Sequence, residues 1–328
     1  MPSPTRAFIT STDSWPMTTE QAEQNCLTKG APTPPRLVYS MQQPPFRSPR
    51  YRFWRRLRRH KLGMLGLATL TLLVLAAILA PIISGHDPAA IDLRMKNTPP
   101  SGDHILGTDA IGRDVWARLV YGAQVSLSVG LVAVTIYTTI ALLLGSIAGY
   151  LGGAVDNVIM RITDIIMCFP TFLLIITVAA VLPPDTYTIM IIIGVFGWPG
   201  MTRLVRGQFL SLRGQDFVVA AVAIGVPTHR IIFRHILPNV IGPVVVAATL
   251  GLAGAIMTES SLSFLGLGVQ QPASSWGQTL TTAMQLPILE GMPWRWLPSA
   301  AAIAFAVLSI NFVGDALRDA FDPSSKLG

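Results

Sequence analysis

Residues 125–150 read VSLSVGLVAVTIYTTIALLLGSIAGY, and no Asp, Glu, Lys or Arg occurs anywhere between Leu119 and Val155. An α-helix needs about 20 apolar residues to cross the roughly 30 Å hydrocarbon layer of a bilayer. A membrane-spanning β-strand would instead alternate apolar and polar residues over about ten positions. This stretch is continuously apolar, so it predicts a transmembrane helix.

Five further segments have the same character, and together they predict an all-α membrane bundle of six transmembrane helices. The expected spans are residues 62–83, 125–150, 162–182, 186–204, 240–257 and 297–313, and the last two are expected to extend into their flanks. Of the 328 residues, 51% are hydrophobic and only 12% are charged. A soluble domain carries about twice this charge, so a soluble enzyme, a disordered chain and a disulfide scaffold are all disfavoured.

The distribution of basic residues predicts which helix ends face the cytoplasm. Eight Lys and Arg residues lie between Arg47 and Lys61, directly before the first expected span. If both termini are cytoplasmic, 19 of the 24 basic residues fall in cytoplasmic segments and five in outer segments. Cytoplasmic loops carry such an excess, so we expect this orientation. The same bias explains the net charge of +7, and no nucleic-acid partner is expected because no groove-reading motif accompanies it.

Composition divides the chain into three parts. Residues 1–45 are polar and rich in Pro, Ser, Thr and Gln, which is typical of a disordered cytoplasmic leader. Residues 46–61 are basic and aromatic, and we interpret them as an orientation signal lying on anionic lipid headgroups, with specific lipid binding as the alternative. Residues 62–328 form the membrane domain, with an outer loop at 84–124 and a cytoplasmic loop at 205–239.

The outer loop ends in LGTDAIGRD at residues 106–114, followed by VWARLVYG. Asp114 is a plausible N-cap. The residues after it predict a short helix lying on the outer leaflet, with Trp116 on its apolar face and Arg118 on another face.

The same loop contains five residues of types that bind metals: His86, Asp87, Asp103, His104 and Asp109. Their spacing matches no standard metal site, and turn and capping roles are more common for such residues. We therefore expect no metal on this chain.

The cytoplasmic loop at 205–239 is long, basic and predicted to be helical. Asp216 is expected to cap a helix that runs through Ile224. Gly225 suits a left-handed helix end, and Pro227 prevents the helix from continuing.

A second short helix is expected to begin with Thr228 as its cap and to end at Pro238. The two helices would expose an apolar surface made of Phe217, Val218, Ala221, Ile231, Ile232 and Phe233. Such an elbow either packs on its own bundle or enters a groove in a partner.

Glycines and prolines interrupt several spans. They are Gly145, Gly149 and Gly153 around the end of the second span, Pro170 in the third, and Gly194, Gly197, Pro199 and Gly200 in the fourth. Small residues permit close helix packing, and breaks in a helix permit hinges, so both roles stay open.

Four segments resemble motifs of one protein family, in the same order. Ala220-Ala221, Gly225 and Leu237-Pro238 resemble the E-A-A…G…L-P loop of ABC-importer permeases. Residues 106–114, 259–268 with 275–277, and 311–323 are similar to motifs of the dipeptide, oligopeptide and nickel branch. Over about residues 50–328 the chain is most similar to the second, C-type permease subunit.

The resemblance implies one subunit of an ATP-driven importer in a bacterial inner membrane. Its partners would be a second permease subunit, one or two ATPase subunits and an extracytoplasmic substrate-binding protein. ATP and magnesium would bind to the ATPase subunits. This chain lacks the phosphate-binding Gly-x-x-x-x-Gly-Lys-Ser/Thr motif, so we expect neither a cofactor nor enzyme activity on it.

The resemblance also implies roles for particular residues. The ATPase-coupling residues would be Asp216, Phe217, Ala220, Ala221, Gly225, Arg230, Arg234, His235, Leu237 and Pro238. The outer-loop family motif comprises Gly107, Thr108, Asp109, Gly112, Arg113 and Asp114. Substrate-binding residues cannot be assigned from the sequence.

Two positions depart from the family pattern. Val219 stands where the family has glutamate, and Val222 stands where arginine is frequent. An ion pair from position 219 to the ATPase is therefore not expected. Asp216, Arg230 and Arg234 are expected to supply polar contacts instead.

Other functions stay open at this level. The solute is a peptide, nickel or another small solute. A secondary transporter is the main rival, but Asp164, Glu259 and Asn311 lie near span ends rather than at mid-membrane, where a proton relay would need them. An intramembrane hydrolase lacks a histidine at membrane depth to activate a nucleophile, and a receptor or scaffold is opposed only by the loop motifs.

Overall fold

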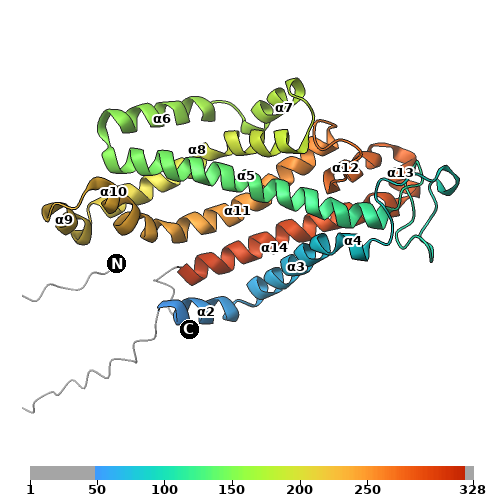
Figure 1. Ribbon diagram of the computed structural model, residues 1–328, viewed down its shortest axis with the longest axis horizontal. Coiled ribbons are helices and arrows are strands. Elements are labelled where there is room, and N and C mark those ends of the chain that lie inside the picture. The colour runs from blue at the N-terminus through green and yellow to red at the C-terminus, as the bar shows by residue number, and fades with distance from the viewer. Residues whose placement is uncertain (1–48, 322–328) are drawn as a thin grey trace, which may run out of the picture. The chain divides into compact units, whose positions relative to one another are not determined.

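The computed structural model describes residues 49–321, which are mostly helical (Figure 1). The helices are α2 (Pro49–Arg59), α3 (Lys61–Ile78), α4 (Ala80–Ile83), η1 (Leu93–Met95), α5 (Val115–Leu151), α6 (Gly153–Met167), α7 (Thr171–Val181), α8 (Thr186–Arg213), α9 (Asp216–Ala223), α10 (Thr228–Arg230), η2 (Ile231–Ile236), α11 (Leu237–Phe264), α12 (Trp276–Leu280), η3 (Thr281–Met284), α13 (Leu286–Gly291), η4 (Pro293–Arg295) and α14 (Leu297–Phe321). The predicted leader at 1–45 lies outside the described residues, so its disorder stays a prediction.

Within residues 49–321, five helical segments are long and apolar enough to cross a membrane: α3, α5, α8, the run from α10 to α11, and α14. The pair α6 and α7 makes a sixth span if it is counted as one, bent by 78° at a short break. This confirms the predicted all-α class and the six spans, but the third span is broken. Pro170, at the N-cap of α7, explains the break because proline disfavours helical geometry in the residue before it.

The centre of the bundle is the long contact between α5 and α8. A Cβ added to Gly145 or Gly149 of α5 would lie 2.7 Å from Val205 or 2.6 Å from Phe209 of α8. These two glycines therefore serve close helix packing. Gly153 differs, because it has a φ of +59° and lies at the turn between α5 and α6.

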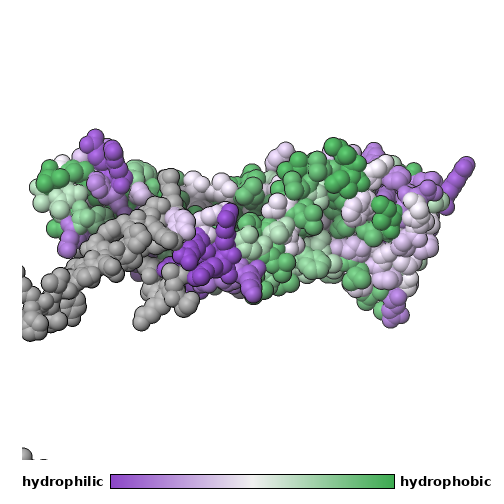
Figure 2. All heavy atoms as spheres, turned by 90° about the horizontal axis from the view of Figure 1, so that it is seen from below, coloured by the Kyte–Doolittle hydropathy of each residue, from purple (hydrophilic) through white to green (hydrophobic). Residues whose placement is uncertain are grey.

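The remaining helices place polar segments at both ends of the bundle. α14 packs against both α3 and α11. Figure 1 shows α9 and α10 at one end, and α4, α12 and α13 at the opposite end. Figure 2 shows a broad apolar area across the middle of the helices, as a membrane-spanning bundle requires, and hydrophilic residues toward the ends, although apolar residues are also visible at the end that carries α9 and α10.

The short outer-leaflet helix predicted after Asp114 does not form as a separate element. α5 starts at Val115 and continues to Leu151, and Asp114 occupies its N-cap position without a side-chain capping hydrogen bond. Arg118 is only 3% exposed. The reason is tertiary: the chain around α12 covers the start of α5, where the Trp276 Nε1 donates to the carbonyl of Leu119 at 3.0 Å.

Candidate functional site

The chain reverses direction in a helical elbow, residues 216–238, between α8 and α11. Gly225 ends α9 with a φ of +77°, as predicted for a left-handed helix end. The Val226 N–H donates to the carbonyl of Ala221 at 3.1 Å and closes the turn. A Cβ at Gly225 would meet nothing within 4 Å, so the backbone conformation alone favours glycine there.

Three boundaries in the elbow differ from the predictions. Gln215, not Asp216, occupies the N-cap of α9, although Asp216 in the first turn still suits the helix dipole. Pro227, not Thr228, occupies the N-cap of α10. No helix ends at Pro238, because the π-helical turn η2 leads directly into α11, and this wider turn accommodates the missing N–H of the proline.

Most of the residues that were predicted to form the exposed apolar surface of the elbow do not form it. Val218, Ala221 and Ile231 are buried against the bundle. The exposed large apolar side chains are Phe217, Val219, Val222, Ile224 and Phe233. Beside Val219 and Val222 lies a cavity of about 300 Å³, which Tyr150 and Arg213 also line.

The two positions that depart from the family pattern therefore lie on the exposed surface of the elbow. Val219 is 56% exposed and Val222 is 55% exposed. Asp216, Arg230 and Arg234 are also exposed. A partner at this surface would meet apolar side chains at positions 219 and 222, with charges nearby. Among the other predicted coupling residues, Ala220 and Pro238 are exposed, while His235 and Leu237 are partly buried.

Two ion pairs tie α6 to α8, the helix that enters the elbow. The Nε and Nη2 of Arg206 lie 2.5 and 2.6 Å from the two carboxylate oxygens of Asp156. The Nη2 of Arg203 lies 2.5 Å from Oδ1 of Asp164. Because α8 also packs along α5, a displacement of the elbow would be passed to several helices together.

A cavity of about 360 Å³ lies between α5, α7, α8 and α11. Its lining residues are Tyr137, Thr171, Ile175, Ile193, Gly197, Gly200, Met201, Leu204, Ala247, Gly251, Gly254, Ala255 and Thr258. Most are small or apolar, and hydroxyl groups come from Tyr137, Thr171 and Thr258. A Cβ added to Gly200 or Gly254 would meet nothing within 4 Å.

Sequence reasoning missed this cavity. It singled out Gly197 and Gly200 as packing or hinge residues, and that was the only signal that pointed to it. Gly197 does pack, since a Cβ there would lie 2.8 Å from the ring of Tyr137. The cavity exists only when α5 and α11 pack with the consecutive helices α7 and α8.

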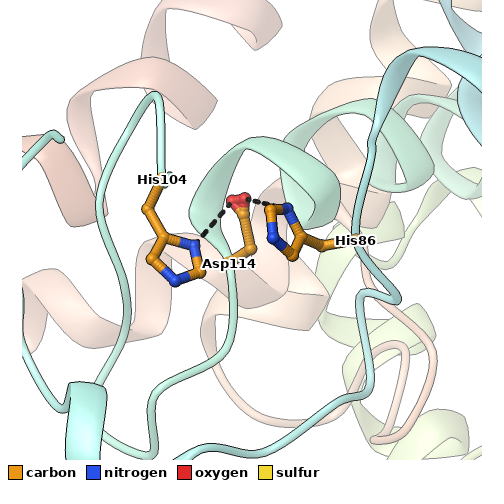
Figure 3. Close-up of side chains that lie close together, drawn as sticks. All are labelled: His86, His104 and Asp114. Carbon is orange, nitrogen blue, oxygen red and sulfur yellow. Dashed lines mark ion pairs between the residues drawn. The ribbon is translucent and has the colours of Figure 1, made fainter. Parts of the chain in front are cut away.

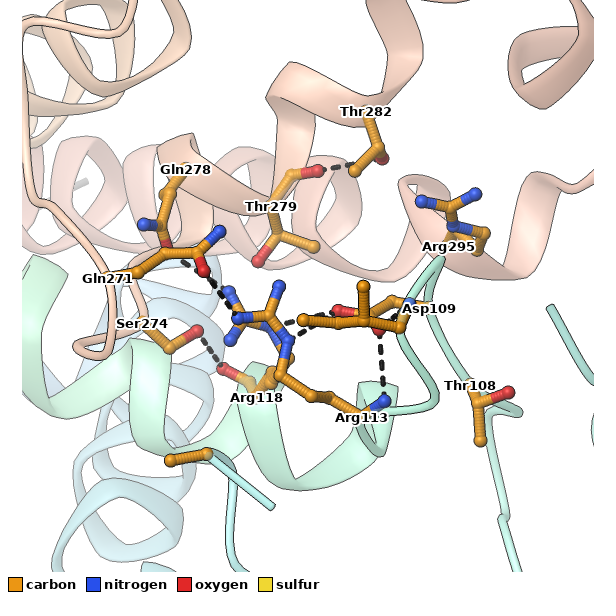
Figure 4. A network of polar contacts seen from close by, with 12 residues as sticks. Thr108, Asp109, Arg113, Arg118, Gln271, Ser274, Gln278, Thr279, Thr282 and Arg295 are labelled. Atoms are coloured by element: carbon orange, nitrogen blue, oxygen red, sulfur yellow. Dashed lines mark hydrogen bonds and ion pairs between the residues drawn. The ribbon is translucent and has the colours of Figure 1, made fainter. Parts of the chain in front are cut away.

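The outer-loop motif folds into a buried unit at the other end, which we call the outer brace: residues 92–118 with 271–282 and Arg295 (Figure 4). Asp109 accepts from the Nε of Arg113 at 2.7 Å. Arg113 Nη1 donates to Gln271 Oε1, and Arg118 Nη2 donates to Gln278 Oε1, both at 3.0 Å. The network therefore joins the start of α5 to the chain around α12.

Arg295 brings a third segment to the brace. It is 3% exposed, and its Nη1 donates to Asn97 Oδ1 at 2.9 Å. Burial lowers the pKa of its guanidinium, although Asp109 opposes this shift. The residues just before α14 are thereby attached to the outer loop.

The turns of the motif are closed by tight backbone contacts. Thr108 Oγ1 accepts from the N–H of Thr98 at 2.9 Å and donates to the carbonyl of Met95. Gly112 has a φ of +83°, and a Cβ there would lie 1.7 Å from the carbonyl oxygen of Asp92. Both the conformation and the lack of space therefore require glycine at position 112.

A buried carboxylate connects the brace to the membrane helices. Glu259 of α11 is fully buried, and its two oxygens accept from Ser126 Oγ at 3.0 Å and from Ser263 Oγ at 2.8 Å. The Ser126 hydroxyl oxygen also accepts from the N–H of Trp276 at 3.2 Å. These bonds join α5, α11 and α12. Glu259 therefore has a structural role.

Comparison with known proteins agrees with this architecture. The family described as "Binding-protein-dependent transport system inner membrane component" matches residues 141–327, and the "N-terminal TM domain of oligopeptide transport permease C" matches residues 48–100. Over 268 residues the chain is 42% identical to the oligopeptide transport system permease protein OppC of Bacillus subtilis (strain 168), covering 82% of this chain and 87% of the relative.

Two further proteins are similar. The dipeptide transport system permease protein DppC of the same organism is 42% identical over 270 residues, covering 82% of this chain and 84% of the relative. A chain of the MetNI methionine ABC transporter, solved in inward-facing conformations, superimposes with a TM-score of 0.51 at 18% identity. That match covers 62% of this chain and 96% of the other, and it shows a shared fold.

Proposed function

The chain belongs to the family of binding-protein-dependent transport system inner membrane components, and from this premise we propose that it is the C-type permease subunit of a peptide importer. As a member of this family it is a multi-pass membrane permease component of an ABC transporter. It works with ATPase subunits and a second permease. We assign ATP hydrolysis, with ATP and magnesium, to those ATPase subunits.

The cavity between α5, α7, α8 and α11 forms this subunit's part of the solute path. Among its lining residues there is no His, Cys, Asp or Glu. A nickel ion would need such groups as ligands, and a proton-driven transporter would usually place a carboxylate or histidine there. Small apolar walls with a few hydroxyls instead suit a solute with variable side chains, and this favours peptides.

The elbow couples the path to the ATPase. The observation that carries this proposal is connectivity: α8 enters the elbow, α11 leaves it, and both helices line the cavity. Movement of the elbow therefore reaches the cavity through two continuous helices. At positions 219 and 222 the docking contact is apolar rather than ionic, and Asp216, Arg230 and Arg234 provide charges around it.

The basic residues support an orientation with the elbow and both termini in the cytoplasm. The outer brace then lies on the other side of a bacterial inner membrane, where an extracytoplasmic binding protein delivers the peptide. Residues 46–61, which include α2, lie at the cytoplasmic surface in this arrangement. Six basic residues lie in α2: Arg50, Arg52, Arg55, Arg56, Arg58 and Arg59.

Uptake of a labelled peptide by the complete importer in proteoliposomes tests the coupling role. Gly225→Val forces a branched residue into a left-handed conformation, so we expect uptake to fall about tenfold or more while the amount of assembled complex is unchanged. Gly214→Val is the matched control, because Gly214 has a φ of −86° and open space around it. Normal uptake by Gly225→Val would refute coupling through the elbow.

The ATPase subunits provide a second test. Omitting them should abolish uptake by an importer of this kind. Uptake driven by a proton gradient through the permease subunits alone would instead identify a secondary transporter. Nickel uptake without peptide uptake would contradict the assignment of the cavity.

A further inference from the structure

Three side chains of metal-binding types meet at the outer end of the molecule, two of them from the outer brace: His86, His104 and Asp114 (Figure 3). One possible ligand atom from each lies within 4.8 Å of the others. The Nδ1 atoms of His86 and His104 lie 4.0 and 3.9 Å from the two carboxylate oxygens of Asp114. The two imidazole rings are 5.0 Å apart.

Two polar atoms of this cluster have no hydrogen-bond partner. Asp114 is 4% exposed. Its Oδ1 and the Nδ1 of His104 are buried without a hydrogen bond in the described part of the chain. Buried polar atoms are nearly always satisfied by a protein group, a water or an ion. Burial raises the pKa of the Asp114 carboxyl, and the backbone N–H of Ala117 opposes the rise, as do His104 and His86.

We propose that His86, His104 and Asp114 bind one divalent transition-metal ion, for which Zn²⁺ is the best fit. Two imidazole nitrogens and one carboxylate oxygen are ligands that zinc prefers, and they leave a fourth position for water. Tetrahedral ligands at about 2.0–2.1 Å from zinc lie roughly 3.3 Å from one another. The three groups therefore need to approach by about 1.5 Å at most, and the 46% exposed His86 side chain is free to supply most of that movement.

This site differs from the grouping considered from the sequence. Two of the aspartates in that grouping have other roles: Asp109 pairs with Arg113, and Asp87 Oδ1 accepts from the N–H of Ala89 at 2.8 Å. The third ligand is Asp114, which the sequence indicated as a helix cap and as part of the outer-loop family motif. The expectation that the chain binds no metal rested on spacing, and spacing does not reveal a site formed by three separate turns.

A bound ion would connect three segments of the outer end: the chain after α4, the loop at His104 and the N-cap of α5. Two of these segments belong to the outer brace, and none of the three residues lines the central cavity. The ion would therefore stabilise the outer end without taking part in transport, and the proposal does not rest on the peptide specificity of the path.

The test uses the full-length chain in its complex with the partner subunits, purified without a polyhistidine tag and stripped with a chelator. Zn²⁺ is titrated in competition with a chromogenic chelator, and Co²⁺ serves as the spectroscopic probe of the ligand set. We expect one Zn²⁺ site that is lost in the variants described next. Excess Mg²⁺ should not displace the Zn²⁺, because Mg²⁺ prefers oxygen ligands. Affinity should fall at acidic pH, because a protonated imidazole cannot ligate.

His86→Gln is the decisive variant, because this side chain is half exposed. We expect it to weaken Zn²⁺ binding at least tenfold, as should His104→Gln. His229→Gln, at an exposed position in the elbow, is the matched control and should leave this binding unchanged. The proposal is overturned if the wild-type complex binds no Zn²⁺ or if His86→Gln binds it as tightly as the wild type.

Discussion

The elbow and the outer brace both contain glycines and charges, but they use them in opposite ways. At the elbow, Gly225 has open space around it, and Val219 and Ile224 are exposed. In the brace, Gly112 is pressed against the carbonyl of Asp92, and Asp109 is buried among hydrogen bonds. The elbow therefore presents exposed apolar side chains, whereas the brace is a buried network of ion pairs and hydrogen bonds within the chain.

This comparison predicts that substitutions in the brace lower stability, while substitutions in the elbow lower transport. The largest effect should come from Asp109→Asn, which removes the negative charge among Arg113, Arg118 and Arg295 and leaves buried guanidinium groups without it. Breaking a buried pair in this way costs about 3–5 kcal/mol. Thermal unfolding of the purified complex measures it, and Asp103→Asn, at an exposed position in the same loop, is the control. If Asp109→Asn melted at the same temperature as Asp103→Asn, the brace would not depend on the buried charge of Asp109.

Gly112→Ala should have the next largest effect. The added methyl group meets the carbonyl of Asp92 and the residue has a φ of +83°, so we expect a loss of about 2–3 kcal/mol in the free energy of unfolding. Gly102→Ala is the matched control, since a Cβ at Gly102 meets nothing within 4 Å. An equal loss of unfolding free energy in Gly112→Ala and Gly102→Ala would contradict this prediction.

Val219→Gln should affect transport rather than folding. The side chain is 56% exposed, so the melting temperature should hardly change. If position 219 docks on an apolar surface of the ATPase, however, peptide uptake should fall about fivefold, which corresponds to about 1 kcal/mol. Val219→Ile keeps the apolar contact and should transport normally. Faster uptake by Val219→Gln would show that the docking surface is polar.

Gly225→Ala should have the smallest effect on stability. The methyl group enters open space, and the left-handed conformation alone costs about 1 kcal/mol. Chemical unfolding of the Gly225→Ala and Gly112→Ala complexes under the same conditions would measure the contrast between the two ends. If Gly225→Ala lost more unfolding free energy than Gly112→Ala, the contrast between the elbow and the brace would be reversed.

The parts that sequence analysis predicted correctly depend on local patterns. The spans follow from continuous hydropathy, and the left-handed end of α9 follows from Gly225 with Pro227 after it. Errors of one residue at Asp216 and Thr228 are also local, since a cap is decided by the exact turn of the backbone. The error at Pro238 has a similar origin, because a π-helical turn allows a proline that a regular helix would exclude.

The remaining errors arose where distant segments meet. Arg118 is buried because the chain around α12 covers the start of α5, and no pattern near Arg118 indicates that cover. In the same way, Val218, Ala221 and Ile231 turn inward because the bundle is beside them. Hydrophobic periodicity shows that a face is apolar, but not whether a partner or the protein's own core covers it.

The sequence by itself determined that this chain crosses a membrane, where its helices lie, and which family it resembles. These properties depend on the transfer of apolar residues into lipid and on short motifs, which act over neighbouring residues. Only the tertiary structure decided the central cavity, the exposed apolar surface of the elbow, and the meeting of His86, His104 and Asp114. Each of these requires segments far apart in the chain to pack together, and packing depends on shape and close contact, which the order of residues does not display.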